Sequence, residues 1–189
     1  MARLVVVDRD GTLNVERHYL SDPELVELLP NVASGLTLLR DMGFSVAVVT
    51  NQSALSRGFI SRETLDGIHG RLRDLLKAQG ATVDAIYFCP HLPEAGCRCR
   101  KPQTGLLEQA ARDFGATPQE TFVIGDQSSD IEIGRKAGAT TLLVQTGYGA
   151  TTLEQGKITP DYVVADVLGA AQTIQKLLSP TQAATLHRG

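Results

Sequence analysis

The segment RLVVVDRDGT, residues 3–12, determines the expected fold. Its four consecutive apolar residues, 4–7, are typical of a strand that is covered on both faces of a parallel sheet. Two acids, Asp8 and Asp10, follow this strand directly. Ligands bind at the carboxyl ends of the strands in such sheets, so polar residues at these ends indicate a binding or catalytic site. The segment therefore predicts a buried first strand that delivers two carboxylates to a functional site.

Short apolar runs and segments with helical spacing alternate along the rest of the chain. The expected strands are residues 4–7, 44–49, 85–88, 121–124, 141–144 and 162–164. The expected helices are residues 32–42, 62–79, 105–114, 130–137 and 167–178. This alternation predicts an open, doubly wound, mainly parallel α/β sheet of the Rossmann-like kind. We expect residues 1–178 to form a single domain without a large cap domain, and residues 179–189 to form a loose polar tail.

Composition excludes several functional classes. The 189 residues are 42% hydrophobic and 21% charged, with a net charge of -3, which argues against a general nucleic-acid or membrane surface. The apolar run at the N-terminus is too short for a secretory signal. The three cysteines of a chain without an export signal are expected to be reduced thiols in the cytoplasm. We expect a cytoplasmic monomer with no nucleic-acid or membrane partner.

Polar side chains follow several of the expected strands. Asp8 and Asp10 follow the first, Thr50 the second and Asp126 the fourth, and Lys101 follows the loop after the third. Two neighbouring carboxylates repel each other and need a counter-cation, and Mg²⁺ suits oxygen ligands. A hydroxyl and a fixed positive charge beside them predict a phosphate site with a carboxylate nucleophile. The alternative is that the two aspartates only cap turns.

All three cysteines lie in the segment CPHLPEAGCRCRKP, residues 89–102. With the histidine of this segment they make a candidate Zn²⁺ site, whose ligands are Cys89, His91, Cys97 and Cys99. Three thiolates and one imidazole complete a tetrahedral site with no open position, which is typical of structural zinc. Such a zinc loop, residues 89–99, would hold Arg100 and Lys101 over the site. The alternative is a disulfide or merely buried thiols.

Four motifs resemble, in order, the signature motifs of the haloacid dehalogenase superfamily. They are Asp8-Arg9-Asp10-Gly11-Thr12, Thr50-Asn51, Arg100-Lys101-Pro102, and Gly125-Asp126 followed by Asp130. The resemblance implies that Asp8 attacks phosphorus to form an aspartyl-phosphate, and that Asp10 protonates the leaving alkoxide and later activates water. It also implies that Mg²⁺ is held by the Asp8 carboxylate, the Asp10 backbone carbonyl and Asp126, while Thr50 and Lys101 steady the phosphate and the nucleophile.

Within that superfamily, the zinc loop resembles two phosphatase families. One acts on D-glycero-D-manno-heptose 1,7-bisphosphate and the other on histidinol phosphate. Residues 50–58 and 14–19 are more similar to the heptose family. That similarity implies removal of the C7 phosphate in the synthesis of ADP- or GDP-heptose precursors, such as those of lipopolysaccharide. The chain departs from this family at Gln127, where the family often has lysine.

The expected substrate is a small, diffusible sugar bisphosphate. The residues expected to bind it are Asp8, Arg9, Asp10, Glu16, Arg17, His18, Tyr19, Thr50, Asn51, Gln52, Ser53, Arg57, Arg100 and Lys101. Arg57 and Arg100 are candidates for a second, non-reacting phosphate, because guanidinium groups suit bidentate phosphate contacts. His69 is expected to be a packing or surface residue in a helix.

Two non-enzymatic functions compete with the phosphatase interpretation. A receiver-like module would also hold an aspartyl-phosphate, but Asp10 argues for turnover, because an acid at this position speeds both steps of hydrolysis. A zinc-dependent nucleic-acid binder would need a basic helix or an aromatic platform, and the sequence has neither pattern.

Overall fold

Six parallel strands form one sheet in the computed structural model, which describes residues 3–179. The strands are β1 (Arg3–Val7), β2 (Phe44–Asn51), β3 (Ala85–Cys89), β4 (Thr121–Gly125), β5 (Thr140–Val144) and β6 (Tyr162–Val164), in the spatial order β3-β2-β1-β4-β5-β6. Val7 is in register with Val48 of β2 and with Ile124 of β4. The chain thus begins in the centre of the sheet and reverses its direction of winding between β1 and β4, where ligands bind in folds of this type.

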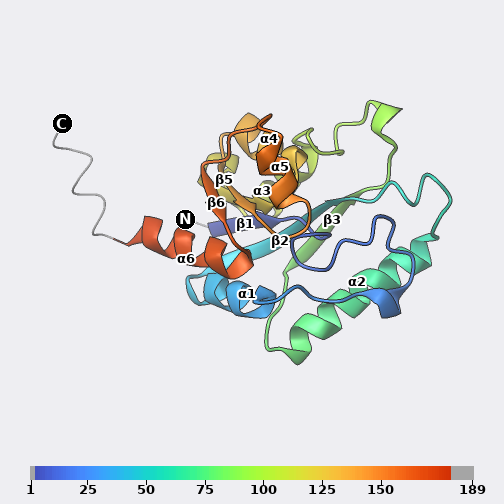
Figure 1. Ribbon diagram of the computed structural model, residues 1–189, viewed down its shortest axis with the longest axis horizontal. Coiled ribbons are helices and arrows are strands. Elements are labelled where there is room, and N and C mark those ends of the chain that lie inside the picture. The colour runs from blue at the N-terminus through green and yellow to red at the C-terminus, as the bar shows by residue number, and fades with distance from the viewer. Residues whose placement is uncertain (1–2, 180–189) are drawn as a thin grey trace.

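Helices cover both faces of the sheet (Figure 1). One face is covered by α1 (Val32–Asp41), α2 (Arg62–Ala78) and α6 (Val167–Leu178), and the other by α3 (Gly105–Asp113) and α4 (Ser128–Ala137). A short helix, α5 (Gly149–Glu154), follows β5, and 3-10 turns lie at Pro23–Leu25, Pro93–Ala95 and Pro118–Glu120. Among these helices, none has both the length and the apolar character that a membrane span requires.

The core explains why the first strand is apolar throughout. Val5 and Val7 point into the cluster formed with α1, α2 and α6, whereas Leu4 and Val6 point into the cluster formed with α3 and α4. Each of these four side chains is at most 1% exposed. Because burial of a large aliphatic side chain stabilises a protein by about 1.5–3 kcal/mol, this strand anchors the sheet.

The expected sheet and helices are confirmed, with differences at their ends. β2 extends through Thr50 and Asn51, which we expected just after the strand, because Asn51 is still in register with Cys89 of β3. Helix α5 was not predicted, since its sequence GATTLE has no helical apolar spacing. The loop between β1 and α1 carries only a 3-10 turn, so the described residues contain no large cap domain. Residues 180–189 of the expected tail lie outside the described part of the chain.

Candidate active site

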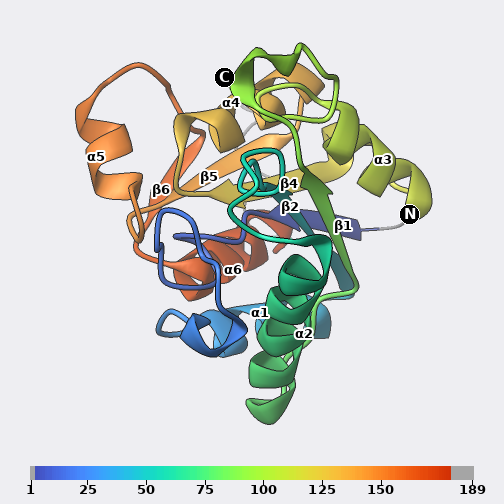
Figure 2. The ribbon, with the colours of Figure 1, turned by 90° about the vertical axis from the view of Figure 1, so that its right-hand side faces the viewer.

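A cavity of about 310 Å³ lies at the carboxyl end of the sheet. Figure 2 looks onto this end, where the loop after β1 (blue), the loop between β2 and α2 (teal) and the loop after β3 (green) lie. Of the residues expected to bind substrate, those that line the cavity are Asp8, Arg9, Asp10, Glu16, His18, Tyr19, Thr50, Asn51, Gln52, Ser53, Arg100 and Lys101. The structure therefore brings together residues from four separate segments of the chain.

Lys101 lies at the centre of the polar network. Its ammonium group is 2.7 Å from Asp8 Oδ1 and 2.6 Å from Asp130 Oδ1, and it donates to the Val49 carbonyl over 2.8 Å. The side chain is 3% exposed, so each of its three N–H bonds needs an acceptor within the protein, and each has one. Burial lowers the pKa of Lys101, but the facing carboxylates of Asp130 and Asp8 outweigh burial and raise it. Lys101 is therefore a permanent positive charge beside Asp8.

The carboxylates of Asp8, Asp126 and Asp130 each place an oxygen within 4.8 Å of the others. All three are buried, and Lys101 balances only one of their charges. Burial, reinforced by the neighbouring carboxylates, raises the pKa of Asp8 to about 7 and that of Asp126 to about 8. A hard divalent cation would neutralise the two remaining charges and favours oxygen ligands. These residues therefore fit Mg²⁺.

The backbone around Asp126 is shaped to admit its carboxylate. Asp126 accepts hydrogen bonds from the Thr12 hydroxyl at 3.4 Å and from the Tyr148 backbone N–H at 2.8 Å. Gly11 and Gly147 have φ values of 80° and 55°, and a Cβ atom at either would collide with the Asp126 carboxylate. Glycine meets both demands, because it has no Cβ and adopts positive φ without strain.

Asp10 lies in a different hydrogen-bond network from Asp8. Its carboxylate accepts from Arg9 Nη2 at 2.7 Å and Nε at 3.1 Å, from Asn14 Nδ2 at 3.0 Å and from Gln52 Nε2 at 2.9 Å. Burial raises the pKa of Asp10, but the charge of Arg9 and these donors outweigh burial and lower it. Its carbonyl oxygen, the expected Mg²⁺ ligand, has no hydrogen-bond donor among residues 3–179 and is free to bind a cation.

Two residues at the end of β2 connect these networks. The Thr50 hydroxyl accepts from Gln52 Nε2 at 2.9 Å, the same amide that donates to Asp10. The Asn51 side chain accepts from the Lys101 backbone N–H at 3.0 Å and donates to the Lys101 carbonyl at 3.2 Å. This paired contact fixes the backbone of Lys101 against β2. The lysine therefore reaches Asp8 from a loop whose position is defined on one side by the sheet.

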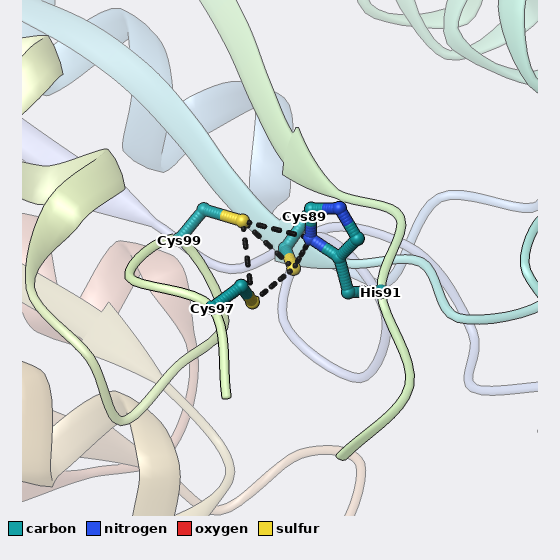
Figure 3. A group of neighbouring side chains, drawn as sticks. All are labelled: Cys89, His91, Cys97 and Cys99. Carbon is teal, nitrogen blue, oxygen red and sulfur yellow. Dashed lines mark hydrogen bonds between the residues drawn. The ribbon is translucent and has the colours of Figure 1, made fainter. Parts of the chain in front are cut away.

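The Cys/His cluster defines the same loop on its other side. In Figure 3 the three sulfur atoms and His91 Nδ1 converge on one point. The sulfur atoms are 3.1–3.6 Å apart, and His91 Nδ1 is 3.5 Å from Cys89 Sγ and 3.2 Å from Cys99 Sγ. A tetrahedral zinc with Zn–S bonds of about 2.3 Å has sulfur atoms about 3.8 Å apart, so a small outward movement would admit the ion. The three thiols are free, which excludes the disulfide alternative here.

Two arginines among the predicted substrate residues point elsewhere. Arg17 donates to the Leu25 carbonyl at 3.0 Å and to Glu27 at 2.9 Å. Arg57 is exposed, with its guanidinium carbon 5.7 Å from the centre of the Tyr19 ring. Neither lines the cavity. Contact with substrate stays a prediction for both.

Sequence reasoning missed several residues of the site. Asp130 was noted only as part of a motif, yet it shares Lys101 with Asp8 and accepts from the Gln127 backbone N–H at 3.0 Å. Ser129 and Tyr148, which the sequence did not point to, also line the cavity. Gln127 lines it as well, and the sequence had marked it only as a departure from the heptose family. The signal for Asp130 was its position in the first turn of the helix that follows Asp126, because an acid there can cap the helix, and in the structure its side chain accepts from the N-cap backbone.

Comparisons with known proteins agree with this site. Residues 98–170 match the family described as HAD-hydrolase-like. The D-glycero-D-manno-heptose-1,7-bisphosphate 7-phosphatase of Thermosynechococcus vestitus is 38% identical, covering 93% of this chain and 97% of that protein. The D-glycero-beta-D-manno-heptose-1,7-bisphosphate 7-phosphatase of Pseudomonas putida is 35% identical, and the matched region covers 91% of this chain and 99% of that protein.

A solved structure matches the fold over almost its whole length. It is the D,D-heptose 1,7-bisphosphate phosphatase of B. bronchiseptica complexed with magnesium and phosphate, with a TM-score of 0.87, 33% identity, and coverage of 93% of this chain and 99% of that one. The fold, the carboxylate–lysine site and these matches define the chain as a phosphatase of the HAD-hydrolase class, as its motifs predicted. Within that class, it belongs to the family of the D-glycero-D-manno-heptose-1,7-bisphosphate 7-phosphatases.

Proposed function

We propose that this protein is a Mg²⁺-dependent phosphatase that removes the C7 phosphate of D-glycero-D-manno-heptose 1,7-bisphosphate, a step in the supply of ADP- or GDP-heptose precursors. The relatives that support this substrate are 38% and 35% identical over more than nine-tenths of the chain. The observation that carries the chemistry is the pairing of Asp8 with Lys101 in the lining of the cavity, with the carboxylate of Asp126 close to that of Asp8.

Asp8 is the proposed nucleophile. Lys101 holds Asp8 Oδ1 at 2.7 Å, while Oδ2 has no hydrogen-bond donor among the described residues and is free to react. The Oδ2 atom forms a bond to phosphorus as the bond from phosphorus to the sugar oxygen O7 breaks, which leaves an aspartyl-phosphate. Holding the attacking oxygen in line with the leaving oxygen is the main contribution a protein makes to phosphoryl transfer.

Asp10 is the proposed acid and base. In the resting structure the lowered pKa of Asp10 keeps its side chain ionised. A residue that removes a proton from water must be in this carboxylate form. An incoming phosphate dianion favours the protonated form of a nearby acid, so Asp10 can take up the proton that it then donates to the sugar O7. In the second step the carboxylate removes a proton from the water that attacks the aspartyl-phosphate. Proton transfers of this kind contribute about 10²–10⁴-fold to rates.

Asp8, Asp126 and the Asp10 carbonyl are the proposed Mg²⁺ ligands. When bound, Mg²⁺ neutralises negative charge on the phosphate oxygens and permits two anions to approach each other. Thr50 and Lys101 supply a hydroxyl and an ammonium group to the same phosphate. Asp130 keeps Lys101 oriented, because its carboxylate lies 2.6 Å from the ammonium.

The rest of the cavity offers contacts for the sugar and its second phosphate. Arg100 lines the cavity and is the proposed ligand of the C1 phosphate. Glu16, His18 and Tyr19 lie on the loop after β1 and are the proposed partners of the sugar hydroxyls. The Cys/His cluster is the proposed structural zinc site, since it leads directly into Arg100 and Lys101.

We also propose that residues 1–178 act as one catalytic domain and that the enzyme is a monomer, because a single chain supplies every residue of the site. Three thiol ligands require a reducing compartment, which supports a cytoplasmic location. Light scattering on the purified full chain measures the mass directly, and a dimer would contradict the monomer proposal.

A substrate panel tests the proposed function. Phosphate release is measured with both anomers of the heptose 1,7-bisphosphate, histidinol phosphate and fructose 1,6-bisphosphate at saturating Mg²⁺. We expect the highest kcat/KM for one heptose bisphosphate anomer, with the C1 phosphate retained in the product. A higher kcat/KM for histidinol phosphate would reject the substrate while leaving the phosphatase chemistry in place.

A further inference from the structure

A buried histidine from α2 contacts the catalytic network. His69 is 6% exposed, and its Nε2 atom lies 3.2 Å from Arg9 Nη1. The two residues are 60 positions apart in sequence, so the fold alone brings them together. The His69 ring also packs against Phe88 of β3, with ring centroids 5.8 Å apart. The ring is thus fixed on one side by packing and on the other by Arg9.

The same arginine contacts Asp10 through its other edge. Arg9 is 1% exposed, and its Nε and Nη2 atoms donate to the Asp10 carboxylate while Nη1 donates to His69. A guanidinium group is planar and rigid, so an acceptor that fixes one edge also fixes the direction of the others. Asn14 and Gln52 each donate one hydrogen bond to Asp10, whereas Arg9 donates through two nitrogen atoms. Arg9 is therefore the main determinant of the Asp10 orientation.

His69 acts as a neutral acceptor in this arrangement. Arginine has only donors, so the contact requires an unprotonated Nε2 atom on His69. Burial, together with the charge of Arg9, lowers the pKa of His69 to about 4, so the ring is neutral near pH 7. A neutral ring accepts from Arg9 without adding charge that would compete with Asp10 for the guanidinium.

We propose that His69 is a positioning residue that, through Arg9, holds the Asp10 carboxylate in the orientation from which it transfers protons to the leaving sugar oxygen and from water. This inference rests on the proposed phosphatase function, in which Asp10 is the acid and base. It assigns a role in the reaction to a residue that does not line the cavity.

The test compares two leaving groups in single-turnover experiments. An alkoxide leaves as an alcohol only if it is protonated, whereas p-nitrophenolate leaves without a proton. We therefore expect His69→Leu to slow phosphoryl transfer from the heptose bisphosphate about ten-fold, which is a fraction of the rate enhancement that general acid catalysis supplies. The rate of transfer from p-nitrophenyl phosphate should change less than about two-fold. His69→Gln, whose side-chain oxygen can accept from Arg9, should stay within about three-fold of the wild type on both substrates.

Ile68→Val is the matched control, because Ile68 is 0% exposed in the same helix and has no polar contact with Arg9. Urea unfolding of each variant separates loss of stability from loss of rate. If His69→Leu does not fold, His69→Met carries the same expectation. Equal slowing on both substrates, an unchanged rate in His69→Leu, or the same pattern in Ile68→Val would each overturn the proposal.

The test does not depend on which sugar phosphate the enzyme prefers. If the wild type prefers another sugar or alkyl phosphate, the comparison is made with that ester, so failure of the substrate assignment is separate from failure of this inference.

Discussion

Replacing Lys101 with methionine removes the only ammonium group among residues 3–179 that contacts Asp8 and Asp130, and leaves the volume of the side chain nearly unchanged. The structure gives the expected magnitude. Both ion pairs are shorter than 2.8 Å, and the lysine is 3% exposed. Removing one partner of a buried ion pair costs about 3–5 kcal/mol, because the remaining charge has no compensation. We expect Lys101→Met to lose about that much free energy of unfolding in magnesium-free buffer.

The loss of free energy of unfolding in Lys101→Met should increase as pH rises. Burial already raises the pKa of Asp8 to about 7, and removal of Lys101 raises it further. The native variant then binds more protons than the unfolded chain, so its stability falls as pH rises, by up to about 1.4 kcal/mol per pH unit for each such proton. The difference between wild type and variant should therefore be smaller at pH 6 than at pH 8. Urea unfolding at the two pH values, without chelator so that bound zinc is retained, measures it.

Lys77→Met is the control for this experiment, since Lys77 is exposed at the end of α2 and makes no ion pair with another described residue. It should change stability by less than about 0.5 kcal/mol. With Mg²⁺ present, Lys101→Met should also lose at least about 10²-fold in kcat, as expected when a charge that contacts the reacting groups is removed. A loss of stability below about 1 kcal/mol that does not grow from pH 6 to pH 8 would refute the reasoning about Lys101.

Three further predictions concern other parts of the molecule. Asp8→Asn should fold normally but fall below about 1% of wild-type kcat, because an amide does not attack phosphorus; higher residual turnover in a phosphate-release assay would remove Asp8 from the nucleophile role. Cys99→Ser should reduce bound zinc from about one ion per chain to a small fraction, and should lower activity because the position of Lys101 is less well defined. Elemental analysis checks this, and the absence of zinc from wild-type protein purified without chelator would contradict it. The pKa of His69, depressed from 6.5 to about 4, means that the unfolded chain binds a proton that the native chain does not, so stability is lost as pH falls below about 6.5. Between pH 7 and pH 5 the free energy of unfolding of the wild type should therefore fall by about 2 kcal/mol more than that of His69→Gln, as measured by urea unfolding with added zinc. Equal losses in the two proteins would show that His69 is not held neutral.

The fold could be predicted largely because a central parallel strand is apolar on both faces. Residues 4–7 can be read as such a strand without knowledge of their partners, and both of their faces are buried in the structure. Helix α5 could not be predicted in this way. Its six residues have only Gly149 and Thr152 buried, so no apolar period marks it. It forms after β5, where the Tyr148 backbone N–H bonds to Asp126.

The site was predictable where residues lie at strand ends, and less so where it depends on tertiary contacts. Asp8, Thr50 and Asp126 were found because parallel strands bring their carboxyl ends to one edge of the sheet. The contact between His69 and Arg9 joins residues 60 positions apart, and no local pattern reports it.

The orientation of long exposed side chains is a separate difficulty. Arg57 lies over the Tyr19 ring rather than in the cavity, as several rotamers of comparable energy are open to such a residue and local packing selects one. Sequence patterns therefore predict the backbone positions of the site better than the contacts of its flexible arginines.

The most direct test of the account is to trap the phosphorylated nucleophile. Asp10→Asn should still permit Asp8 to attack p-nitrophenyl phosphate, whose leaving group needs no proton. It should slow the hydrolysis of the aspartyl-phosphate, because the attacking water loses its base. After incubation of Asp10→Asn with p-nitrophenyl phosphate and Mg²⁺ and an acid quench, intact-mass spectrometry should show the addition of one phosphoryl group, which peptide mapping places on Asp8. The double variant with Asp8→Asn should show none. A phosphoryl group on another residue, or release of the C7 phosphate by Asp8→Asn at the wild-type rate, would contradict the account.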